Sequence, residues 1–310
     1  MAWHLVTERR TLDLSKNHND FDDCFPKIIK MNNFIDAYER TQLTSTKYRK
    51  PSIEFSIDLM TNLKSLRDEV AAGEYRPRGY NVFEISRPKK RRIEAPKFED
   101  KIVQFAVHNI SNPTFERKFI YDSYACQEDK GTHRCADRIQ HFLRKAKWSW
   151  GDNAWIIKAD IKSFFYSIKH HILKKILAKK IKCKKTLQLL NTIIDNSINE
   201  IGLPLGNVTS QLLANIYLNE LDQFCKRKLG LKFYVRYMDD SCIIVKSREK
   251  AKQIKKIISE FVKEKLDIKM NKKKTKIFPI NQGINIVGYK IHPTHMLLRA
   301  RTKKKIKQKC

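Results

Sequence analysis

The stretch KFYVRYMDDSCIIV, residues 232–245, decides the fold of this chain. Its two arms, Lys232–Tyr237 and Ser241–Val245, are strand-like runs rich in apolar residues. Only the segment Met238–Asp240 separates them, which is the length of a tight hairpin turn. An Asp pair is a frequent turn element, so this stretch alone favours an ordinary hairpin over a functional one.

A further acid ends an apolar run about eighty residues earlier. Trp155–Asp160 has the pattern of a buried strand that delivers a carboxylate at its end. Taken alone, Asp160 fits equally well as the N-cap of a helix over Ser163–Ile168. The loop LPLG at 203–206 and an amphipathic helix expected over Thr209–Asp222 precede the hairpin. This order of strand, loop, helix and hairpin matches the palm of a nucleic-acid polymerase.

The three acids suit two-metal chemistry. Nucleotidyl transfer uses two divalent ions about 4 Å apart, one at the primer hydroxyl and one at the triphosphate. Mg2+ prefers carboxylate oxygens, and strand ends hold such groups in a fixed geometry. We therefore expect Asp160, Asp239 and Asp240 to converge within a mixed α+β fold.

The charge of the chain points to a polyanionic partner. Its 310 residues include 64 Lys and Arg against 33 Asp and Glu, which gives a formal net charge of +31. A basic tail or a membrane-surface helix would concentrate this charge in one segment. Instead, basic clusters interleaved with apolar residues recur at Arg87–Arg92, Lys174–Lys185, Lys250–Lys276 and Arg299–Lys309. This pattern predicts a folded basic surface that binds nucleic acid in a salt-dependent way.

The cysteines and the distribution of apolar residues indicate the cellular compartment. The seven cysteines form an odd set without a C-x-x-C pair, so neither a disulfide framework nor a zinc knuckle is indicated. No apolar stretch approaches the roughly 20 residues that span a bilayer, and the N-terminal residues lack a signal-peptide core. We expect a cytoplasmic protein without membrane contact.

The remaining segments predict helices and one basic hairpin. Helical spacing of apolar residues through Phe25–Ala72 indicates two helices. A basic β-hairpin is expected over Tyr80–Ile93. Further helices are expected over Asp100–Asn109, ending before Pro113, and over Thr132–Ala146.

These motifs resemble those of the reverse transcriptase family from about Tyr75 to Arg299. The resemblance implies a right-hand polymerase with fingers, a palm and a much reduced thumb. It divides the chain into an N-terminal leader (1–25), fingers (26–100), the first part of the palm (101–165), a second fingers part (166–204), the palm with catalytic hairpin and primer grip (205–292), and a basic C-terminal remnant (293–310).

The resemblance also implies the catalytic residues. Asp160, Asp239 and Asp240 would hold two Mg2+ ions, or Mn2+ in their place, together with the backbone carbonyl of Ile161. A lysine within Leu266–Lys276 is expected to protonate the departing pyrophosphate, and several lysines there compete for the role.

Residues of the nucleotide pocket follow from the same resemblance. The Phe165 ring would exclude a ribose 2′-hydroxyl by steric clash. The alternative is that Phe164 and Phe165 are both core residues, and one of the two is expected to be. Arg91 and Arg92 resemble the residues that grip the triphosphate, because a planar guanidinium binds phosphate oxygens in pairs. The sequence does not choose between these two arginines.

A narrower resemblance concerns LGNVTSQ, residues 205–211, which is similar to the (I/V/L)-G-x-x-x-S-Q signature of bacterial diversity-generating retroelement enzymes. It implies that Leu205, Gly206 and Gln211 belong to the nucleotide pocket. The motifs YAC (124–126), GTHR (131–134) and QGINIVGY (282–289) resemble that group and its relatives in phage defence. Retroviral enzymes carry Gln where this chain has Leu205, and the lost amide favours relaxed fidelity. The residues do not separate diversification from defence.

Nucleic-acid contacts are implied beyond the pocket. Gly288 and Tyr289 resemble the primer grip, with simple packing as the alternative. Four basic residues are also expected to bind nucleic acid: Lys89, Lys90, Arg299 and Arg301.

Partners follow from the substrates and from the missing thumb. The chain stops about twenty residues after Tyr289, which is too short for the helical thumb that family members usually have. We expect an accessory protein, a further copy of the chain or a structured RNA to supply that function. The resemblance implies a structured non-coding RNA template, a DNA or RNA primer and deoxynucleotides as the other partners.

Two alternatives remain to be weighed. An RNA-dependent RNA polymerase or a two-metal nuclease would use similar acids, but Phe165 and the Tyr237-Met238 pair argue against both. A basic RNA-binding scaffold with a polymerase fold would have no need for three clustered acids on a strongly positive chain.

Overall fold

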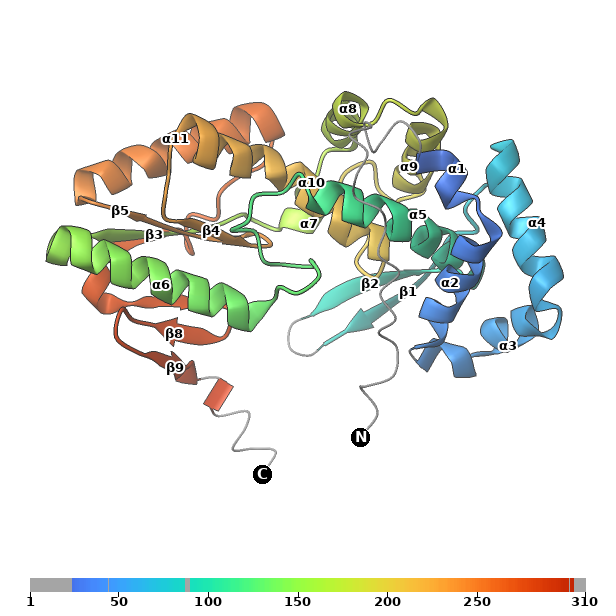
Figure 1. The fold of residues 1–310 in the computed structure, drawn as a ribbon, viewed down its shortest axis with the longest axis horizontal. Helices are drawn as coiled ribbons and strands as arrows, with labels where there is room; N and C mark the ends of the chain where they lie inside the picture. Colours follow the sequence, from blue (N-terminus) through green and yellow to red (C-terminus); the bar gives the residue numbers. More distant parts are fainter. Residues whose placement is uncertain (1–23, 44, 87–89, 301, 304–310) are drawn as a thin grey trace, which may run out of the picture.

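Figure 1 shows the computed structural model, which describes residues 24–43, 45–86, 90–300 and 302–303. The expected leader at 1–25 therefore lies almost wholly outside the described residues. The first elements are α1 Cys24–Ile28, α2 Met31–Gln42, η1 Ser45–Tyr48, α3 Lys50–Ile57, α4 Leu59–Ala72, β1 Tyr80–Ile85, β2 Arg91–Pro96, α5 Phe98–Glu116 and α6 Thr132–Trp150. Then come η2 Gly151–Asn153, β3 Trp155–Asp160, α7 Phe164–Ser167, α8 His170–Lys180, α9 Lys184–Asp195, α10 Val208–Gln223 and η3 Phe224–Lys228. The last are β4 Tyr234–Tyr237, β5 Asp240–Val245, α11 Arg248–Leu266, β6 Lys276–Pro279, η4 Ile280–Gln282, β7 Ile284–Ile286, β8 Tyr289–Ile291 and β9 Met296–Leu298.

A four-stranded antiparallel sheet in the order β4-β5-β3-β6 forms the centre of one half of the molecule. Helix α11 lies on one side of this sheet, and α6 lies on the other (Figure 1). Side chains alternate between the two faces, as the period of a strand requires. Ile157 and Ile243 join the core that includes residues of α10 and α11. Ile156 and Ile244 join a second core with residues of α6.

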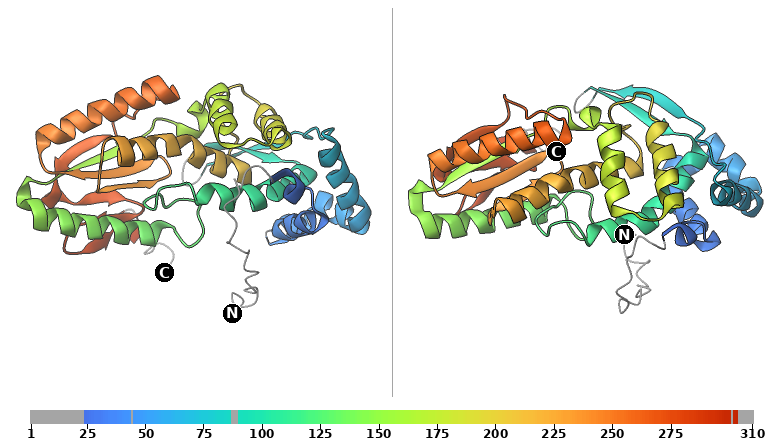
Figure 2. Two further views of the ribbon diagram at one scale, coloured as in Figure 1. Left: turned by 45° about the horizontal axis from the view of Figure 1, so that its top comes forward. Right: turned by 90° about the horizontal axis from the view of Figure 1, so that it is seen from above.

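Helices make up most of the other half. Figure 2 shows that α1–α4 lie at the opposite end of an elongated molecule from the central sheet. Helix α5 packs against α2 and α10, and so connects the two halves. The β1–β2 hairpin extends from this half, with Ile85 opposite Arg91 at its outer end. The mixed α+β class expected from the sequence is therefore confirmed.

A small sheet, β7-β8-β9, packs beside α6. The residue directly before β7 must be glycine, because at Gly283 φ is +62° and a Cβ would lie 2.6 Å from the carbonyl oxygen of Ile291. The hydroxyl of Tyr289 lies 2.8 Å from Nδ1 of His133 at the start of α6. Two motifs far apart in the sequence, GTHR and QGINIVGY, thus meet in space.

Helix α5 corrects one expectation, because it continues through Pro113 to Glu116 instead of ending before the proline. A proline inside a helix removes one backbone donor and crowds the preceding turn. Packing offsets this cost here, since Phe115 beyond the proline is buried and the helix lies against α2 and α10. Helix α6 likewise runs past Ala146 to Trp150.

Within the described ranges, no helix has both the length and the apolar character required to cross a bilayer.

Candidate active site

Strands β3 and β5 bring two of the predicted acids face to face. Asp160 and Asp240 are directly opposite in the antiparallel register, where paired residues have Cβ atoms about 4.5–5.5 Å apart. Asp160 is 2% exposed, and the Oδ1 atoms of both residues are buried without a hydrogen-bond partner among the described residues. Asp239 is adjacent on the β4–β5 turn. The alternative role of Asp160 as a helix N-cap does not apply, because Asp160 ends β3 and Ser163 is the residue that precedes α7.

The three carboxylates concentrate negative charge in a partly desolvated site. Burial raises the pKa of Asp239, and the carboxylates of Asp240 and Asp160 raise it further. Burial also raises the pKa of Asp240, while Lys158 lowers it and Asp160 raises it. Such a group of acids is stabilised by cations, which compensate both for lost hydration and for mutual repulsion.

Two lysines partly compensate the negative charge of these acids. Lys274 donates a hydrogen bond of 2.7 Å from Nζ to Oδ2 of Asp160, and this bond raises the lysine pKa. Lys158 Nζ lies 3.8 Å from Oδ1 of Asp240 and donates to the carbonyl oxygen of Asn285 in β7. The family resemblance implies a functional lysine within 266–276, and Lys274 is the lysine of that range that forms an ion pair with an acid of the site.

The fit to a divalent ion rests on the facing pair of acids. Asp160 and Asp240 each have a buried carboxylate oxygen that accepts no hydrogen bond from the described residues, and such oxygens are the hard ligands that Mg2+ prefers. In the described part of the chain, no three side chains of the His, Cys, Asp or Glu type are already arranged to hold a metal. Lys274 occupies one oxygen of Asp160 in this arrangement. The buried Ile161 follows directly and forms a bridge with Met270.

Arg236 stabilises the turn that carries Asp239 and Asp240, and the sequence did not lead us to expect a role for it. Met238 has φ of +51°, a left-handed conformation that is unusual for a residue with a side chain. Its carbonyl oxygen accepts a hydrogen bond of 3.0 Å from Nη1 of Arg236. Arg236 is 1% exposed, so its charge lies inside the protein. A charged residue in the middle of an apolar strand run was the available signal.

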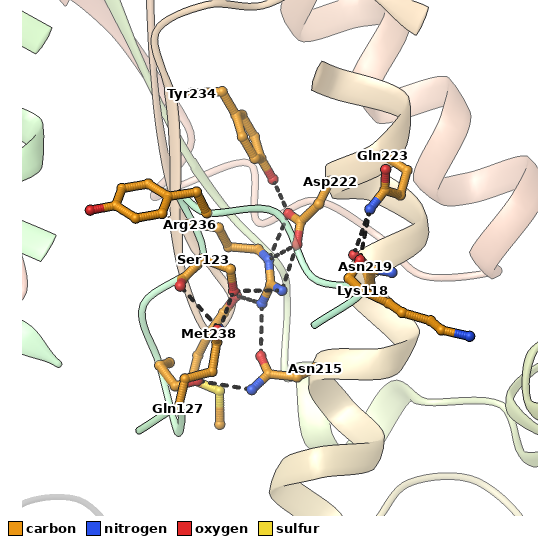
Figure 3. A network of polar contacts seen from close by, with 12 residues as sticks. Lys118, Ser123, Gln127, Asn215, Asn219, Asp222, Gln223, Tyr234, Arg236 and Met238 are labelled. Atoms are coloured by element: carbon orange, nitrogen blue, oxygen red, sulfur yellow. Dashed lines mark hydrogen bonds and ion pairs between the residues drawn. The ribbon is translucent and has the colours of Figure 1, made fainter. Parts of the chain in front are cut away.

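Figure 3 shows how the Arg236 guanidinium is accommodated. Its Nε and Nη2 donate to the two oxygens of Asp222 in α10, each at 2.7 Å. Nη1 also donates to Asn215, and Nη2 donates to Ser123. Tyr234 donates its hydroxyl to Asp222 at 2.7 Å. Both charges are therefore paired and hydrogen-bonded, which is the condition for burying them.

The 203–206 loop carries the predicted pocket residues Leu205 and Gly206 and is hydrogen-bonded to Phe165 and to β2. Phe164 is buried and Phe165 is half-buried, so one of the two rings is core, as the sequence predicts. The Phe165 carbonyl oxygen accepts a bond of 2.7 Å from the amide of Leu203. The Leu205 carbonyl oxygen accepts one of 2.9 Å from Glu94 in β2.

Glycine at position 206 keeps the loop close to the β1–β2 hairpin. A Cβ on Gly206 would lie 3.2 Å from the Glu94 carbonyl oxygen, at a φ of +125°. Glu94 is buried and its carboxylate lies 3.3 Å from Nε of Arg92. Arg91 is exposed on the same strand, and Gln211 is exposed in the first turn of α10.

The predicted nucleic-acid contacts are more widely spread. Gly288 and Tyr289 lie at the β7–β8 turn, and the Gly288 carbonyl oxygen accepts a bond of 3.1 Å from the Arg299 amide. Arg299 lies near enough to Asp240 to lower the pKa of that acid. Lys90 pairs with Glu84 at 2.9 Å within the β1–β2 hairpin. Lys89 and Arg301 lie outside the described residues.

Comparisons with known proteins agree on one family. Residues 84–291, more than half of the chain, match the family model described as "Reverse transcriptase (RNA-dependent DNA polymerase)". The chain is 28% identical to protein YkfC of Escherichia coli, with 79% of this chain and 73% of YkfC covered. It is 33% identical to the retron Ec73 reverse transcriptase of Escherichia coli, covering 50% of this chain and 54% of that protein.

Longer relatives share the fold over about half of their length. The group II intron-encoded protein LtrA of Lactococcus lactis is 26% identical, with 74% of this chain and 49% of LtrA covered. The apo telomerase structure from Candida tropicalis superposes with a TM-score of 0.57 at 14% identity, covering 72% of this chain and 49% of that chain. At this identity the telomerase match shows the fold alone.

Replacing Arg236 by Met should lower the free energy of unfolding by about 3–5 kcal/mol, because Asp222 is then left as a buried charge without its partner. Denaturant unfolding measures this change. Lys50→Met is the control, since it breaks an ion pair with Glu54 whose side chains are 84% and 58% exposed, and it should have a far smaller effect. Similar losses in the two variants would contradict the assigned role of Arg236.

Proposed function

The chain belongs to the reverse transcriptase family of RNA-directed DNA polymerases, and we propose that Asp160, Asp239 and Asp240 hold two Mg2+ ions for nucleotidyl transfer. The observation that carries this proposal is the register of β3 and β5, which puts Asp160 opposite Asp240, each with a buried Oδ1 that accepts no hydrogen bond from the described residues. Bound there, the ions would activate the primer hydroxyl and hold the triphosphate. Mn2+ would accept the same oxygen ligands.

Lys274 is our candidate for the proton donor to the leaving pyrophosphate. Its hydrogen bond to Asp160 keeps it protonated, because that bond raises its pKa. A cation at Asp160 would compete with the ammonium for the same oxygen, and so release Lys274 toward the substrate. The Ile161 carbonyl remains the proposed backbone ligand next to Asp160.

The nucleotide would lie between the 203–206 loop and the hairpin. Phe165 is the proposed barrier to a 2′-hydroxyl, since its ring is only half-buried whereas Phe164 is fully buried. Arg91 is the better candidate for gripping the triphosphate, because Arg92 is engaged by Glu94. Leu205, Gly206 and Gln211 complete the proposed pocket.

The template and primer would follow the basic surface. Gly288 and Tyr289 are proposed to hold the primer end near the acids. Lys158 supports this placement, because it pairs with Asp240 and also donates a hydrogen bond to Asn285 in β7. Lys90 and Arg299 are proposed phosphate contacts, as are Lys89 and Arg301. A net charge of +31 supports an RNA partner of considerable size. The printed name of the Ec73 relative, a retron reverse transcriptase, supports a dedicated structured RNA as template.

For the biological role, we propose one assignment and one alternative. The signature at 205–211 supports a diversity-generating retroelement enzyme, and the same chemistry in phage defence is the alternative. Neighbouring genes test this choice, since a variable-repeat target beside the gene would favour diversification. The idea that a partner supplies thumb function stays a prediction, which the mass of the purified RNA complex would test.

Asp239→Asn combined with Asp240→Asn should abolish DNA synthesis on the co-purified RNA, because amides bind Mg2+ far more weakly than carboxylates. RNA affinity should change little, since no phosphate-binding cation is removed. Sequencing of the DNA product and a filter-binding assay measure the two quantities. Asp195→Asn on α9 is the control, because Asp195 is exposed and pairs with Lys174 instead. A double variant that still makes DNA would refute the assigned site.

Phe165→Val should increase ribonucleotide incorporation relative to deoxynucleotides by about 10- to 100-fold, because a smaller side chain leaves room for the 2′-oxygen. Steady-state kcat/KM for the matched nucleotide pairs measures the ratio. Tyr166→Val is the control on the adjacent, exposed position. An unchanged ratio in Phe165→Val would assign this ring to packing alone.

Leu205→Gln should lower the misincorporation rate by about tenfold, in line with the net value of one added hydrogen bond near the base pair. High-throughput sequencing of the DNA product measures the rate. Equal error rates in the two proteins would exclude Leu205 as the source of relaxed fidelity.

A further inference from the structure

The outward face of α6 carries a row of basic and aromatic side chains, which we call the α6 stripe. Its members follow one another at spacings of three and four residues, which places them on one side of the helix: Arg134, Arg138, His141, Lys145 and Trp148. Four of them are exposed and Arg138 is half-buried. Ile139 and Leu143 on the opposite side are buried in the core below the sheet. Since α6 lies on the side of the sheet away from α11 (Figure 1), the stripe faces solvent.

Two aromatic rings are exposed along this face. Trp148 is 89% exposed, although tryptophan is on average a well-buried residue. Tyr121, which adjoins the stripe at Arg138, is 70% exposed. Cζ of Arg138 lies 5.1 Å from the centroid of the Tyr121 ring, and Nζ of Lys130 lies 5.3 Å from it. Trp148 follows Arg138 by ten residues, so the two rings are held about 15 Å apart along the helix.

Positive charge along the stripe is only partly compensated. Helix α6 contains five Lys and Arg residues and one acid, Asp137. Among the described residues, its ion pairs are those of Arg138 with Asp122 and of Lys147 with Asp152, so Lys145 has none. Asp122 also pairs with Lys226 at 2.7 Å and is thus shared by two cations. This face is therefore complementary to a polyanion.

Arg144, beside the stripe, is in a similar state. Its Nε donates to the carbonyl oxygen of Pro293 at 2.9 Å, and its Nη2 donates to the side-chain oxygen of Gln140 at 3.1 Å. Both acceptors are neutral, so the guanidinium keeps its full charge while its position is fixed. A fixed guanidinium next to an exposed indole can bind a phosphate without first losing conformational freedom.

The Trp148 end of the stripe lies far from the proposed catalytic acids. The neighbouring Trp150 packs on Phe233, with ring centroids 5.3 Å apart. Phe233 comes just before β4, and the turn that carries Asp239 follows the other end of that strand. A strand of this length spans about 13 Å. Trp148 is therefore outside the proposed nucleotide pocket.

The combination of rings and cations limits the kind of partner. Unpaired RNA offers bases that stack on aromatic rings and phosphates that lie between those bases. A duplex offers phosphates, but its bases are already stacked on one another. A membrane surface requires a broad apolar face on the helix, whereas here the Trp148 indole stands among charged residues. The centre of a protein interface is usually depleted of lysine.

We propose that the α6 stripe, together with Tyr121, is a second RNA-binding surface, which stacks unpaired nucleotides of the RNA outside the catalytic cleft. Tyr121 and Trp148 stack bases, and Arg144 and Lys145 contact the phosphates near Trp148. The assignment goes beyond the proposed function and rests on it only in the choice of RNA over DNA. An RNA-directed polymerase meets its RNA before any DNA exists, so RNA occupies such a surface first.

The test compares Trp148→Ala with Tyr48→Ala in the full chain, after its RNA has been removed at high salt. Tyr48 is a matched control, because it is 74% exposed and has Nζ of Lys47 at 4.8 Å from its ring centroid. It lies among the helices at the opposite end of the molecule (Figure 2). Thermal melting checks that both variants fold.

Affinity for a labelled oligouridylate is measured by fluorescence anisotropy. An excess of a blunt RNA–DNA duplex, which has no unpaired bases, occupies the cleft during the titration. Trp148→Ala should bind about 5- to 150-fold more weakly, the range that corresponds to one lost base stack. Trp148→Phe should recover most of this loss, and Tyr48→Ala should bind like the unaltered chain. Equal affinities in the two alanine variants would overturn the proposal and leave the stripe to a protein partner.

Ultraviolet crosslinking of the RNA complex as purified, followed by mass spectrometry, identifies the strand at the stripe. Peptides that contain Tyr121 or Trp148 should carry ribonucleotides before any deoxynucleotide is added. Crosslinks that appear only after DNA has been made, and that carry deoxynucleotides, would overturn the assignment to RNA.

DNA synthesis on a short primer–template separates this surface from the cleft. Trp148→Ala should retain the unaltered rate there, because a short substrate does not reach the stripe. A parallel loss of synthesis and of oligouridylate affinity would assign Trp148 to the cleft and overturn the proposal. A chain that makes no DNA, yet loses oligouridylate affinity in Trp148→Ala alone, would contradict the proposed function and leave the second surface intact.

Discussion

The buried ion pair between Arg236 and Asp222 is the constraint on which the candidate site depends. Both side chains are almost completely excluded from solvent, so their charges would be costly without each other. The pair joins the β4 strand to helix α10, and the bond from Arg236 to Ser123 adds the segment before α6. Three segments are thereby fixed around one guanidinium, and one of them, at Ser123, lies 113 residues before Arg236 (Figure 3).

This anchoring has a direct effect on the acids. The same guanidinium holds the carbonyl oxygen of Met238, whose backbone is in the left-handed region. A turn held in that conformation keeps Asp240 in register with Asp160 on β3 and leaves Asp239 facing a lysine-lined cavity between α11 and segment 268–275. A buried charge pair of this kind specifies one geometry more than it adds stability. It lies behind the turn, out of the way of substrate.

Some features of the fold and of the candidate site could be predicted from local sequence patterns, whereas others depend on contacts between distant segments. Two strand-like apolar runs and the three-residue gap between them were sufficient to predict the hairpin, and the apolar run before Asp160 was sufficient to predict its strand. The lysine at position 274 could not be chosen, because its neighbours carry the same charge and the distinction comes from the pairing of segment 268–275 with the end of β3. The continuation of α5 through Pro113 was also hidden, since packing against α2 and α10 outweighs a local rule. Arg236 was visible as a charge in an apolar strand, but its partner Asp222 is identified only by the fold.

The segment that carries Lys273 and Lys274 separates two basic cavities. These two lysines line the cavity beside α11, and they also line a cavity of about 580 Å3 whose other residues include Lys158 of β3 and Lys290 of β8. Under the proposed function the second cavity lies toward the primer grip and the first toward the leaving group. The positive charge of one short segment would then neutralise phosphates on both sides of the bond being made. Because Lys274 is also held by Asp160, a cation at the acids would redistribute that charge toward the substrate at the step when negative charge develops on the leaving oxygen.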